Sequence, residues 1–311
     1  MNTPLLTIAV CTHNRAWLLG ESLRALLDQS VGPDEFELLV VDNASTDGTA
    51  ETAQALASSF PFFRLVSEPV LGLSHARNAA LHAATADWVC FLDDDALTTP
   101  NYVETALRLC RQNDFACFGG SIRPWHRDPL PVWFLDEYES DMAHGLVTGT
   151  LPDGSFVSGG NMVVKKQVAL ALGGFDPAFG VCGSVVGYGE ETAFQARMRK
   201  AGHPIGYTPE LVILHYARPE KYTFPAQWLI RYKAGIAWQV LQANRSWAAL
   251  AAIGARLFAS PAKGGYTSLR RLCNGTYRWQ NAALDVTGRF LFTMGRFVGW
   301  IRLRAAVRTS R

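Results

Sequence analysis

Three consecutive carboxylates follow a short apolar run in the segment VCFLDDD, which ends at Asp95. Such charges at the end of a buried strand repel one another and lose hydration, so a cation is the natural compensation. Because side chains alternate along an extended backbone, Asp93 and Asp95 face one side and Asp94 faces the other. Oxygen ligands in this number, with room left for phosphate groups, suit Mg²⁺ or Mn²⁺. The alternative is an acidic turn that caps a helix starting at Thr99-Pro100, although a cap needs only one carboxylate.

Alternating strand and helix patterns place these carboxylates in an α/β fold. Strand patterns at LLTIAVCTHN, FELLVVDNAS and residues 63–67 alternate with helical patterns at 16–29, from 46–47 onward and at 74–84. Near-continuous apolar strands separated by helices predict a mainly parallel sheet with helices on both faces. Ligands collect at the carboxyl ends of the strands in such sheets. Polar groups that follow three strands are expected at one edge: Thr12-His13-Asn14-Arg15, Asp42-Asn43 and Asp93-Asp94-Asp95.

The composition is that of a globular protein with ample core. The chain has 311 residues, of which 49% are hydrophobic and 18% are charged, enough for one large domain and an appendage. The first fifteen residues lack a basic segment, and their apolar run is too short for a signal sequence. Six cysteines without C-x-x-C spacing favour reduced thiols in a cytosolic compartment over disulfides or a zinc site.

The sequence changes character at about residue 116. FACFGGSIRPWHRDPLPVWFLDEY contains three prolines and two tryptophans, which predicts a long loop and makes a central strand implausible. Such a loop either lines a groove or simply packs on the protein. A strand and a helix are expected in SFVSGGNMVVKKQVALALGGFD, a further helix begins at Glu190-Glu191, and the strand PELVILHY ends at His215.

The sequence from Leu5 to about His215 resembles the family 2 glycosyltransferases of GT-A fold. The resemblance rests on AVCTHNR, VVDNASTDGT, GLSHARNAAL, FLDDDA, SGGNMVV, GGFD and GYGEETAF, which occur in the family's order. It implies transfer of a sugar from a nucleotide diphosphate sugar to an acceptor hydroxyl, with inversion at the anomeric carbon. It also implies a GT-A domain over 1–225 with a mostly parallel, Rossmann-like sheet, divided into a nucleotide-sugar half at about 1–115 and an acceptor half at 116–225.

The resemblance implies roles for the residues that would bind the donor. Thr12, Asn14 and Arg15 follow the first strand, where the family places its nucleobase loop. Asp42 matches the position that accepts a hydrogen bond from the base or the ribose. Arg77 matches a position that faces the ribose or the diphosphate, which suits the fork of a guanidinium.

The carboxylates take their roles from the same resemblance. Asp93 is expected near the ribose and also, with Asp95 and His215, among the metal ligands. Asp94 is grouped with the donor-binding residues. His215 matches the place where many GT-A enzymes supply a further ligand, and the alternative is a structural histidine at a strand end.

An inverting transfer also needs a base that takes the proton of the acceptor hydroxyl. Such a base typically increases the reaction rate by roughly 10²–10⁴-fold. The family usually has Glu-Asp where this chain has Glu190-Glu191, and its second acid is the usual base. Glu191 is therefore the predicted base and Glu190 the second choice; alternatively, both acids simply complement the helix dipole. Gly159, Gly160 and Asn161 are expected under the donor sugar, where the absent glycine side chains allow close approach.

The end of the chain has a different charge from the rest. Residues 1–244 hold 17 Lys and Arg against 26 Asp and Glu, whereas residues 245–311 hold 12 against Asp285 alone. Residues 226–311 are predicted to form basic amphipathic helices too short in their apolar runs to span a membrane. Arg289 and Arg296 are seven residues apart and share a helical face opposite Phe290. Such helices lie on anionic membranes, and the alternatives are packing on the catalytic domain or an oligomer interface.

The expected function is a metal-dependent hexosyltransferase. UDP is favoured as the donor nucleotide, with GDP and dTDP open, and the expected acceptor is a polyprenyl-linked glycan or polysaccharide precursor. The expected location is cytoplasmic, at the inner face of the cytoplasmic membrane. No nucleic-acid partner is expected, because the sequence contains no nucleic-acid-binding motif. A sugar-1-phosphate nucleotidyltransferase would need a glycine-rich basic loop, which AVCTHNRAW lacks. Intact Asp93, Asp95 and Glu191 disfavour a silent membrane-bound scaffold of the same fold.

Overall fold

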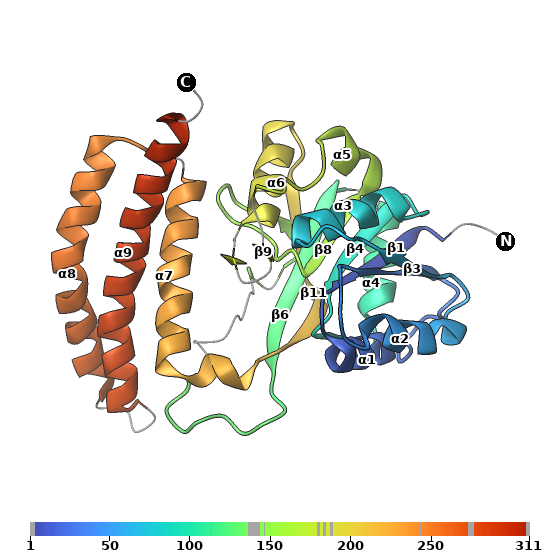
Figure 1. Ribbon diagram of the computed structural model, residues 1–311, viewed down its shortest axis with the longest axis horizontal. Coiled ribbons are helices and arrows are strands. Elements are labelled where there is room, and N and C mark those ends of the chain that lie inside the picture. The colour runs from blue at the N-terminus through green and yellow to red at the C-terminus, as the bar shows by residue number, and fades with distance from the viewer. Residues whose placement is uncertain are drawn as a thin grey trace. The chain divides into compact units, whose positions relative to one another are not determined.

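The computed structural model describes residues 4–112, 114–135, 144–145, 147–178, 181–182, 185–186, 189–242, 244–272 and 277–308. Their chain forms two compact units (Figure 1). One comes from the stretches 1–125 and 140–216, and the other from 126–139 and 217–311. We call them the sheet unit and the helical unit.

The first half of the sheet unit alternates strands and helices as the sequence predicts. In chain order it contains β1 (Leu6–Thr12), α1 (Ala16–Ala25), β2 (Phe36–Asp42), α2 (Thr49–Ala55), a short 3₁₀ turn (Ala57–Ser59), β3 (Phe63–Ser67), α3 (Leu73–Ala83) and β4 (Trp88–Asp93). The four strands are parallel in the order β3-β2-β1-β4. Their carboxyl ends therefore share one edge, where Thr12 lies beside Asp42 in register and Cys11 lies beside Asp93.

The sheet becomes mixed beyond β4. The remaining elements are β5 (Ala96–Thr98), α4 (Tyr102–Gln112), β6 (Cys117–Trp125), β7 (Gly149–Thr150), β8 (Asn161–Lys165), α5 (Lys166–Ala171), the hairpin β9 (Val181–Cys182) and β10 (Val185–Val186), α6 (Glu190–Lys200) and β11 (Ile205–Tyr216). The strand order continues β4-β8-β6-β11-β5. Strand β8 is antiparallel to both of its neighbours, and β11 is parallel to β6 but antiparallel to β5.

The prediction of a long loop from residue 116 onward is wrong for the first part of that segment, because β6 is an interior strand between β8 and β11. Its glycines weaken the strand signal in the sequence, yet the packing requires them. A Cβ on Gly119 would overlap Val157 and the Asn161 carbonyl, and one on Gly120 would overlap Leu211. Pro124 is tolerated because β8 pairs with β6 only as far as Gly119, so one edge of β6 has no β8 partner there.

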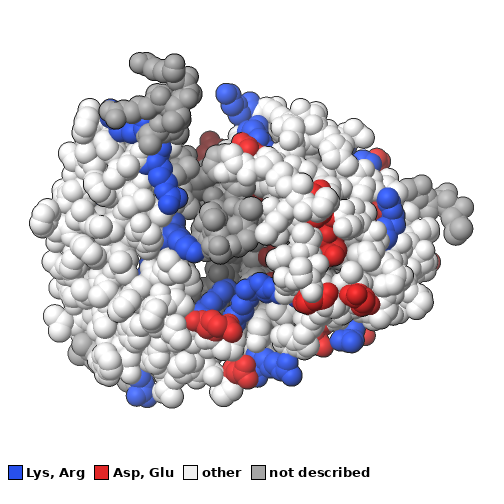
Figure 2. Space-filling view, viewed as in Figure 1, with Lys and Arg blue, Asp and Glu red and all other residues white. Residues whose placement is uncertain are grey.

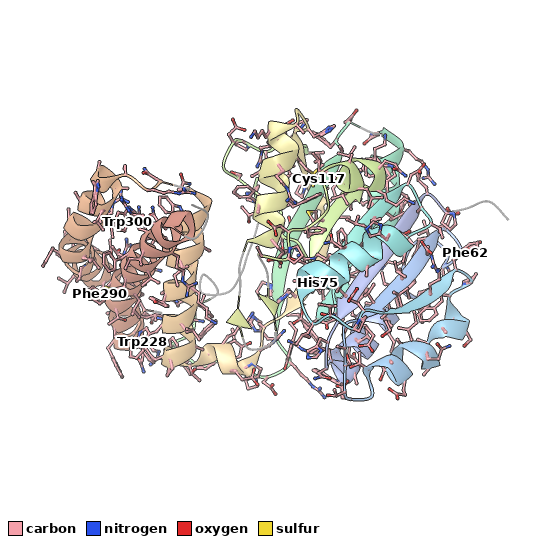
Figure 3. All side chains as sticks on the ribbon, turned by 45° about the horizontal axis from the view of Figure 1, so that its top comes forward. Phe62, His75, Cys117, Trp228, Phe290 and Trp300 are labelled. Carbon is pink, nitrogen blue, oxygen red and sulfur yellow. The ribbon has the colours of Figure 1, made fainter. Side chains whose placement is uncertain are left out.

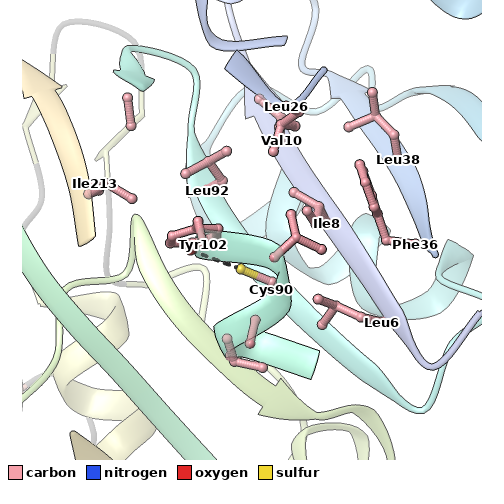
Figure 4. Packing of buried hydrophobic residues seen from close by; sticks show 14 of the residues in the cluster. Leu6, Ile8, Val10, Leu26, Phe36, Leu38, Cys90, Leu92, Tyr102 and Ile213 are labelled. Carbon is pink, nitrogen blue, oxygen red and sulfur yellow. Dashed lines mark hydrogen bonds between the residues drawn. The ribbon is translucent and has the colours of Figure 1, made fainter. Parts of the chain in front are cut away.

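The core lies on both faces of the sheet. One cluster joins alternate strand residues such as Ile8 and Leu38 to α1 and α4, and the other joins residues such as Ala9 and Leu39 to α3, α5 and α6. Figure 4 shows the first cluster, in which the Cys90 thiol lies 3.2 Å from the Tyr102 hydroxyl. Apolar side chains on both faces explain the near-continuous apolar strands of the sequence.

The helical unit consists of a 3₁₀ turn (Pro219–Tyr222) and the helices α7 (Phe224–Leu241), α8 (Trp247–Leu272) and α9 (Trp279–Arg308). Figure 3 labels Trp228, Phe290 and Trp300 on α7 and α9. Glycines let α7 and α9 approach closely: a Cβ on Gly295 would overlap the Tyr232 carbonyl. Among the helices that the structure describes, none is both long and apolar enough to cross a bilayer.

Arg289 and Arg296 both lie on α9, as predicted, but only Arg289 is exposed. Arg296 is only 7% exposed, its guanidinium lies over the Trp238 ring at 4.1 Å, and it donates hydrogen bonds to Gln239 Oε1. Helix α9 packs against both α7 and α8, so most of its circumference is covered. Figure 2 shows basic side chains over the helical unit, whereas most acidic side chains on this face lie over the sheet unit.

Candidate active site

The three carboxylates lie in the turn between β4 and β5. Asp95 is buried and Asp93 is half-buried. Asp94 is not part of the cluster that Asp93 and Asp95 form with His215, and its Oδ2 accepts a hydrogen bond of 2.8 Å from the Thr12 hydroxyl. The end of β1 therefore holds the middle carboxylate, while the outer two face a common space.

The pairing of β5 with β11 brings His215 to Asp93 and Asp95. The Tyr216 amide donates to the Asp95 carbonyl at 2.8 Å, which sets the register beside the carboxylates. The His215 Nε2 atom is 3.1 Å from Asp95 Oδ1 and 3.8 Å from Asp93 Oδ2. One ligand atom from each residue lies within 4.8 Å of the others. Two carboxylate oxygens and an imidazole nitrogen at this spacing fit one divalent cation.

The carboxylates are electrostatically crowded. Burial, followed by the charge of Asp95, raises the pKa of Asp93. The same two causes raise the pKa of Asp94 to about 7, against the opposing effect of Arg15. The Arg15 Nη1 atom lies 3.5 Å from Asp95 Oδ2 and offsets part of the negative charge. Arg15, expected in the nucleobase loop, therefore reaches the carboxylates in this structure.

A buried arginine joins the carboxylates to the glutamate pair. The Arg77 side chain is 4% exposed. Its Nη1 donates a hydrogen bond of 2.8 Å to Glu190 Oε1, and its Nη2 is 3.9 Å from Asp93 Oδ1. The guanidinium carbon lies 5.5 Å from the centre of the Phe175 ring and 5.9 Å from that of Phe91, distances at which a cation is attracted to an aromatic ring.

Two glycines make room for this arrangement. A Cβ on Gly159 would lie 2.7 Å from Arg77 Nη2, and one on Gly160 would overlap the Asp93 carboxylate. These contacts give the protein itself a reason for both glycines, independent of any bound sugar.

The glutamates at the start of α6 have different environments. Glu190 is buried and paired with Arg77. Glu191 is half-buried, and burial, followed by the charge of Glu190, raises its pKa to about 7 although Arg77 acts in the opposite direction. A carboxylate with this pKa suits reversible proton transfer near neutral pH. Helix α6 begins after Gly189, whose φ of 98° is the left-handed conformation that glycine adopts readily.

The loops after β1 and β2 hold each other. The Asn14 amide donates to the Ser45 hydroxyl at 3.0 Å, and the Asn14 side-chain oxygen accepts from the Thr46 amide at 2.8 Å. Asp42 accepts from the Ser45 amide at 3.2 Å. Asn14 and Asp42 are thus linked through one loop at the edge where the sequence predicts them.

Asn161 lies outside this group of side chains. It is fully buried. Its side-chain oxygen accepts from the Tyr102 hydroxyl at 2.9 Å, and its side-chain nitrogen donates to the carbonyls of Ser121 and Leu211, both at 3.0 Å. In this structure the amide ties β8 to β6 and β11 and is not exposed to a ligand.

Sequence reasoning missed the bond between Arg77 and Glu190 and the two rings beside it. The residues of the bond are 113 positions apart, and neither local pattern indicates the other. The one available signal was Phe175, which belongs to the quoted GGFD motif but received no role.

The mixed sheet covered by helices is the fold of the GT-A glycosyltransferases. The chain matches the family model of glycosyl transferase family 2 over residues 7–173. This match spans more than half of the chain, and the protein belongs to that family of glycosyltransferases.

Known relatives agree with this membership. The chain is 29% identical over 248 residues to the succinoglycan biosynthesis protein ExoM of Rhizobium meliloti (strain 1021). This alignment covers 77% of this chain and 72% of ExoM. The mannosyltransferase PcManGT from Pyrobaculum calidifontis, solved with GDP-Man and Mn²⁺, superposes with a TM-score of 0.52 at 18% identity, over 98% of this chain and 76% of that one. TarS 1–349 of S. aureus with UDP gives 0.53 at 16% identity, over 94% and 91%. The two structures confirm the predicted fold.

The first prediction concerns Arg77. Arg77→Met removes the cation beside the buried Glu190 and the half-buried Asp93, so we expect the free energy of unfolding to fall by about 3–5 kcal/mol. Arg108→Met is the matched control. It breaks an ion pair of 2.6 Å with Glu210 whose partners are 44% and 53% exposed, and it should cost at most about 1 kcal/mol. Urea unfolding of the full-length variants measures both. Equal losses in the two variants would contradict the assigned role of Arg77.

Proposed function

We propose that the protein is an inverting glycosyltransferase that uses a divalent metal, a nucleotide diphosphate sugar and Glu191 as general base. One observation carries the proposal: Arg77 links Asp93 of a three-residue metal-type cluster to Glu190, and the next residue, Glu191, has a pKa raised to about 7. Inverting transfer needs charge stabilisation at the leaving group and a base at the acceptor. The network supplies residues suited to both tasks.

The metal site in this proposal consists of Asp93, Asp95 and His215, which would hold Mn²⁺ or Mg²⁺. When bound, the ion supplies positive charge that stabilises the departing nucleotide diphosphate. Arg15 adds a second positive charge beside Asp95. Asp94 has the supporting task of fixing the turn through Thr12.

The donor site comprises the loops after β1 and β2, with Thr12, Asn14 and Asp42 for the base and the ribose. The carbonyls and carboxylates at this edge suit the N–H and hydroxyl groups of such a donor. The two solved relatives hold GDP-Man and UDP respectively, which supports a nucleotide diphosphate donor. We take UDP-sugars as the first class to test and GDP-sugars as the second.

Glu191 is the base because Glu190 is already bonded to Arg77. In the proposed step the acceptor oxygen attacks the anomeric carbon while Glu191 takes its proton. The bond from that carbon to the diphosphate breaks on the opposite face, and the nucleotide diphosphate leaves with the electron pair. The result is inversion at the anomeric carbon.

The acceptor class follows from chemistry and from one relative. ExoM is named for succinoglycan biosynthesis, which supports a glycan or polysaccharide precursor as the acceptor. The described cysteines Cys11, Cys90, Cys110 and Cys117 are free thiols, which supports a reducing compartment. We therefore place the reaction at the cytoplasmic face of a membrane that carries a lipid-linked acceptor.

Helix α8 is the proposed contact with that membrane. Trp247, Phe258 and Leu269 are 67%, 88% and 68% exposed. They are spaced by eleven residues and therefore lie on one face of the helix. The exposed Arg245 and Arg270 lie close in sequence to Trp247 and Leu269. An exposed apolar stripe with basic neighbours fits the surface of an anionic bilayer.

The second prediction tests the metal. Asp95→Asn removes a proposed metal ligand. Mutation of a residue that merely supports a ligand lowers metal affinity by about 10–100-fold, so we expect Asp95→Asn to lower Mn²⁺ affinity by at least as much. Asp94→Asn removes the same charge one residue away and should retain Mn²⁺ affinity within roughly threefold. Electron paramagnetic resonance of free Mn²⁺ measures both without turnover. Similar losses in the two variants would indicate a general charge effect and contradict ligation by Asp95.

The third prediction tests the base. Glu191→Gln removes basicity and should lower turnover by roughly 10²-fold or more, with little change in donor affinity. Wild-type turnover should fall as the pH drops below about 7, because Glu191 must be deprotonated to act. A larger loss in Glu190→Gln, with its donor affinity also intact, would exchange the two roles.

The pH dependence of the free energy of unfolding is an independent test of the raised pKa of Glu191. A pKa raised from 4.5 in the unfolded chain to about 7 in the fold means that the native state binds more protons between these values. Stability from this group is complete below pH 4.5 and is lost as the pH rises through about 7. In the metal-free protein, Glu191→Gln should therefore be more stable than the wild type at pH 8 and nearly equal to it at pH 4.5.

The fourth prediction tests the membrane contact. Phe258→Ser with Leu269→Ser removes two exposed apolar groups of α8, each worth about 1.5–3 kcal/mol when fully buried. We expect at least a tenfold loss of binding to vesicles of phosphatidylglycerol and phosphatidylcholine in a sedimentation assay. Val70→Ser with Val147→Ser is the control, since these exposed valines lie in the sheet unit. High salt should weaken wild-type binding only in part. Equal binding by both double variants would contradict the assignment of α8.

A further inference from the structure

A basic cavity lies within the helical unit. It has a volume of about 540 Å³ and is lined by residues from all three helices. Its cationic residues are Arg231 on α7, Arg256 and Lys263 on α8, and Arg289 on α9. Ala259 and Phe292 add apolar wall. Of the residues in the described part of the chain, no Asp or Glu lines it.

Four cations line one cavity, and no Asp or Glu of the described residues lies among the lining side chains. Like charges repel, and burial, followed by the charge of Arg256, lowers the pKa of Arg296 on α9. An anion bound in the cavity would interact favourably with the four cations.

Local packing orients the Arg231 side chain at the cavity. The Arg231 side chain lies across Gly288, where a Cβ would overlap its Cδ and Nε atoms. Arg231 Nη1 also donates to the Gln227 side-chain oxygen, and Gln227 is buried. A side chain oriented in this way loses less conformational freedom when it binds a ligand.

We propose that this cavity binds a diphosphate group and that Ala259 and Phe292 contact an alkyl or prenyl chain attached to it. Guanidinium forks match the geometry of phosphate oxygens, and the volume lies in the range of small-molecule sites. Three guanidinium groups and an ammonium supply more charge than a single phosphate needs. The apolar wall distinguishes a lipid-borne diphosphate from a free one. The inference uses neither the proposed metal nor the proposed base, so it is tested separately from them.

Calorimetric titration of the full-length protein with inorganic pyrophosphate and with farnesyl diphosphate, in EDTA, tests the site. Arg256→Gln with Arg289→Gln should weaken both probes by at least about tenfold, because a hydrogen bond to a charged group contributes about 1.5–3 kcal/mol. Arg270→Gln with Arg302→Gln is the matched control. These exposed arginines lie on the same two helices outside the cavity, and their loss should change affinity by less than about twofold. Thermal unfolding verifies that both double variants are folded.

Phe292→Ala separates the two sources of diphosphate. It should weaken farnesyl diphosphate several-fold and leave pyrophosphate unchanged. Equal affinity of the wild type for the two probes would overturn the role of the apolar wall. Pyrophosphate binding that survives Arg256→Gln with Arg289→Gln, or that falls equally in the control, would overturn the site itself.

Discussion

The candidate active site depends on one buried guanidinium. Arg77 lies between a carboxylate at the end of β4 and a glutamate at the start of α6, and it is screened from water by Phe91 and Phe175. Removing a charge from water is costly, so its two carboxylate partners must stay in place for the fold to be stable. The contacts that offset this cost also connect the metal-type cluster to α6, the helix that carries the proposed base Glu191.

The carboxylates around Arg77 lower the stability of the fold when they are charged. Burial, followed by the charge of neighbouring carboxylates, raises the pKa values of Asp93, Asp94 and Glu191. These shifts mean that the charged forms are disfavoured in the fold. Local rules of stability are often broken at functional sites and compensated elsewhere. Here the compensation comes from Arg15 and Arg77, together with the extensive core on both faces of the sheet.

The helical unit is assembled by a different principle. Close contact of α7 with α9 depends on glycines such as Gly295, and Arg296 is taken into the packed interior with Trp238. Although α9 is covered on two sides, exposed large apolar side chains lie on both later helices, such as Phe258 and Leu269 on α8 and Trp279 on α9. The basic cavity arises where the three helices meet, and it follows from their packing and not from any contiguous motif.

Local sequence was sufficient for the first half of the fold. Periodicity predicted the strands and helices up to β4, and parallel order brought Thr12, Asp42 and the carboxylates to one edge because all four strands run the same way. The order of the motifs was likewise enough to indicate the family.

Tertiary structure decided the rest. The glycines of β6 weaken a strand in isolation, but neighbouring backbones leave no room for other residues. Asn161 lies in a quoted motif, yet its amide bonds to three distant segments. Arg77 and Glu190 meet only because the chain between them folds back, and His215 reaches Asp95 only through the register of β11 with β5. Each of these outcomes depends on contacts between residues far apart in the chain, and local periodicity carries no information about such contacts.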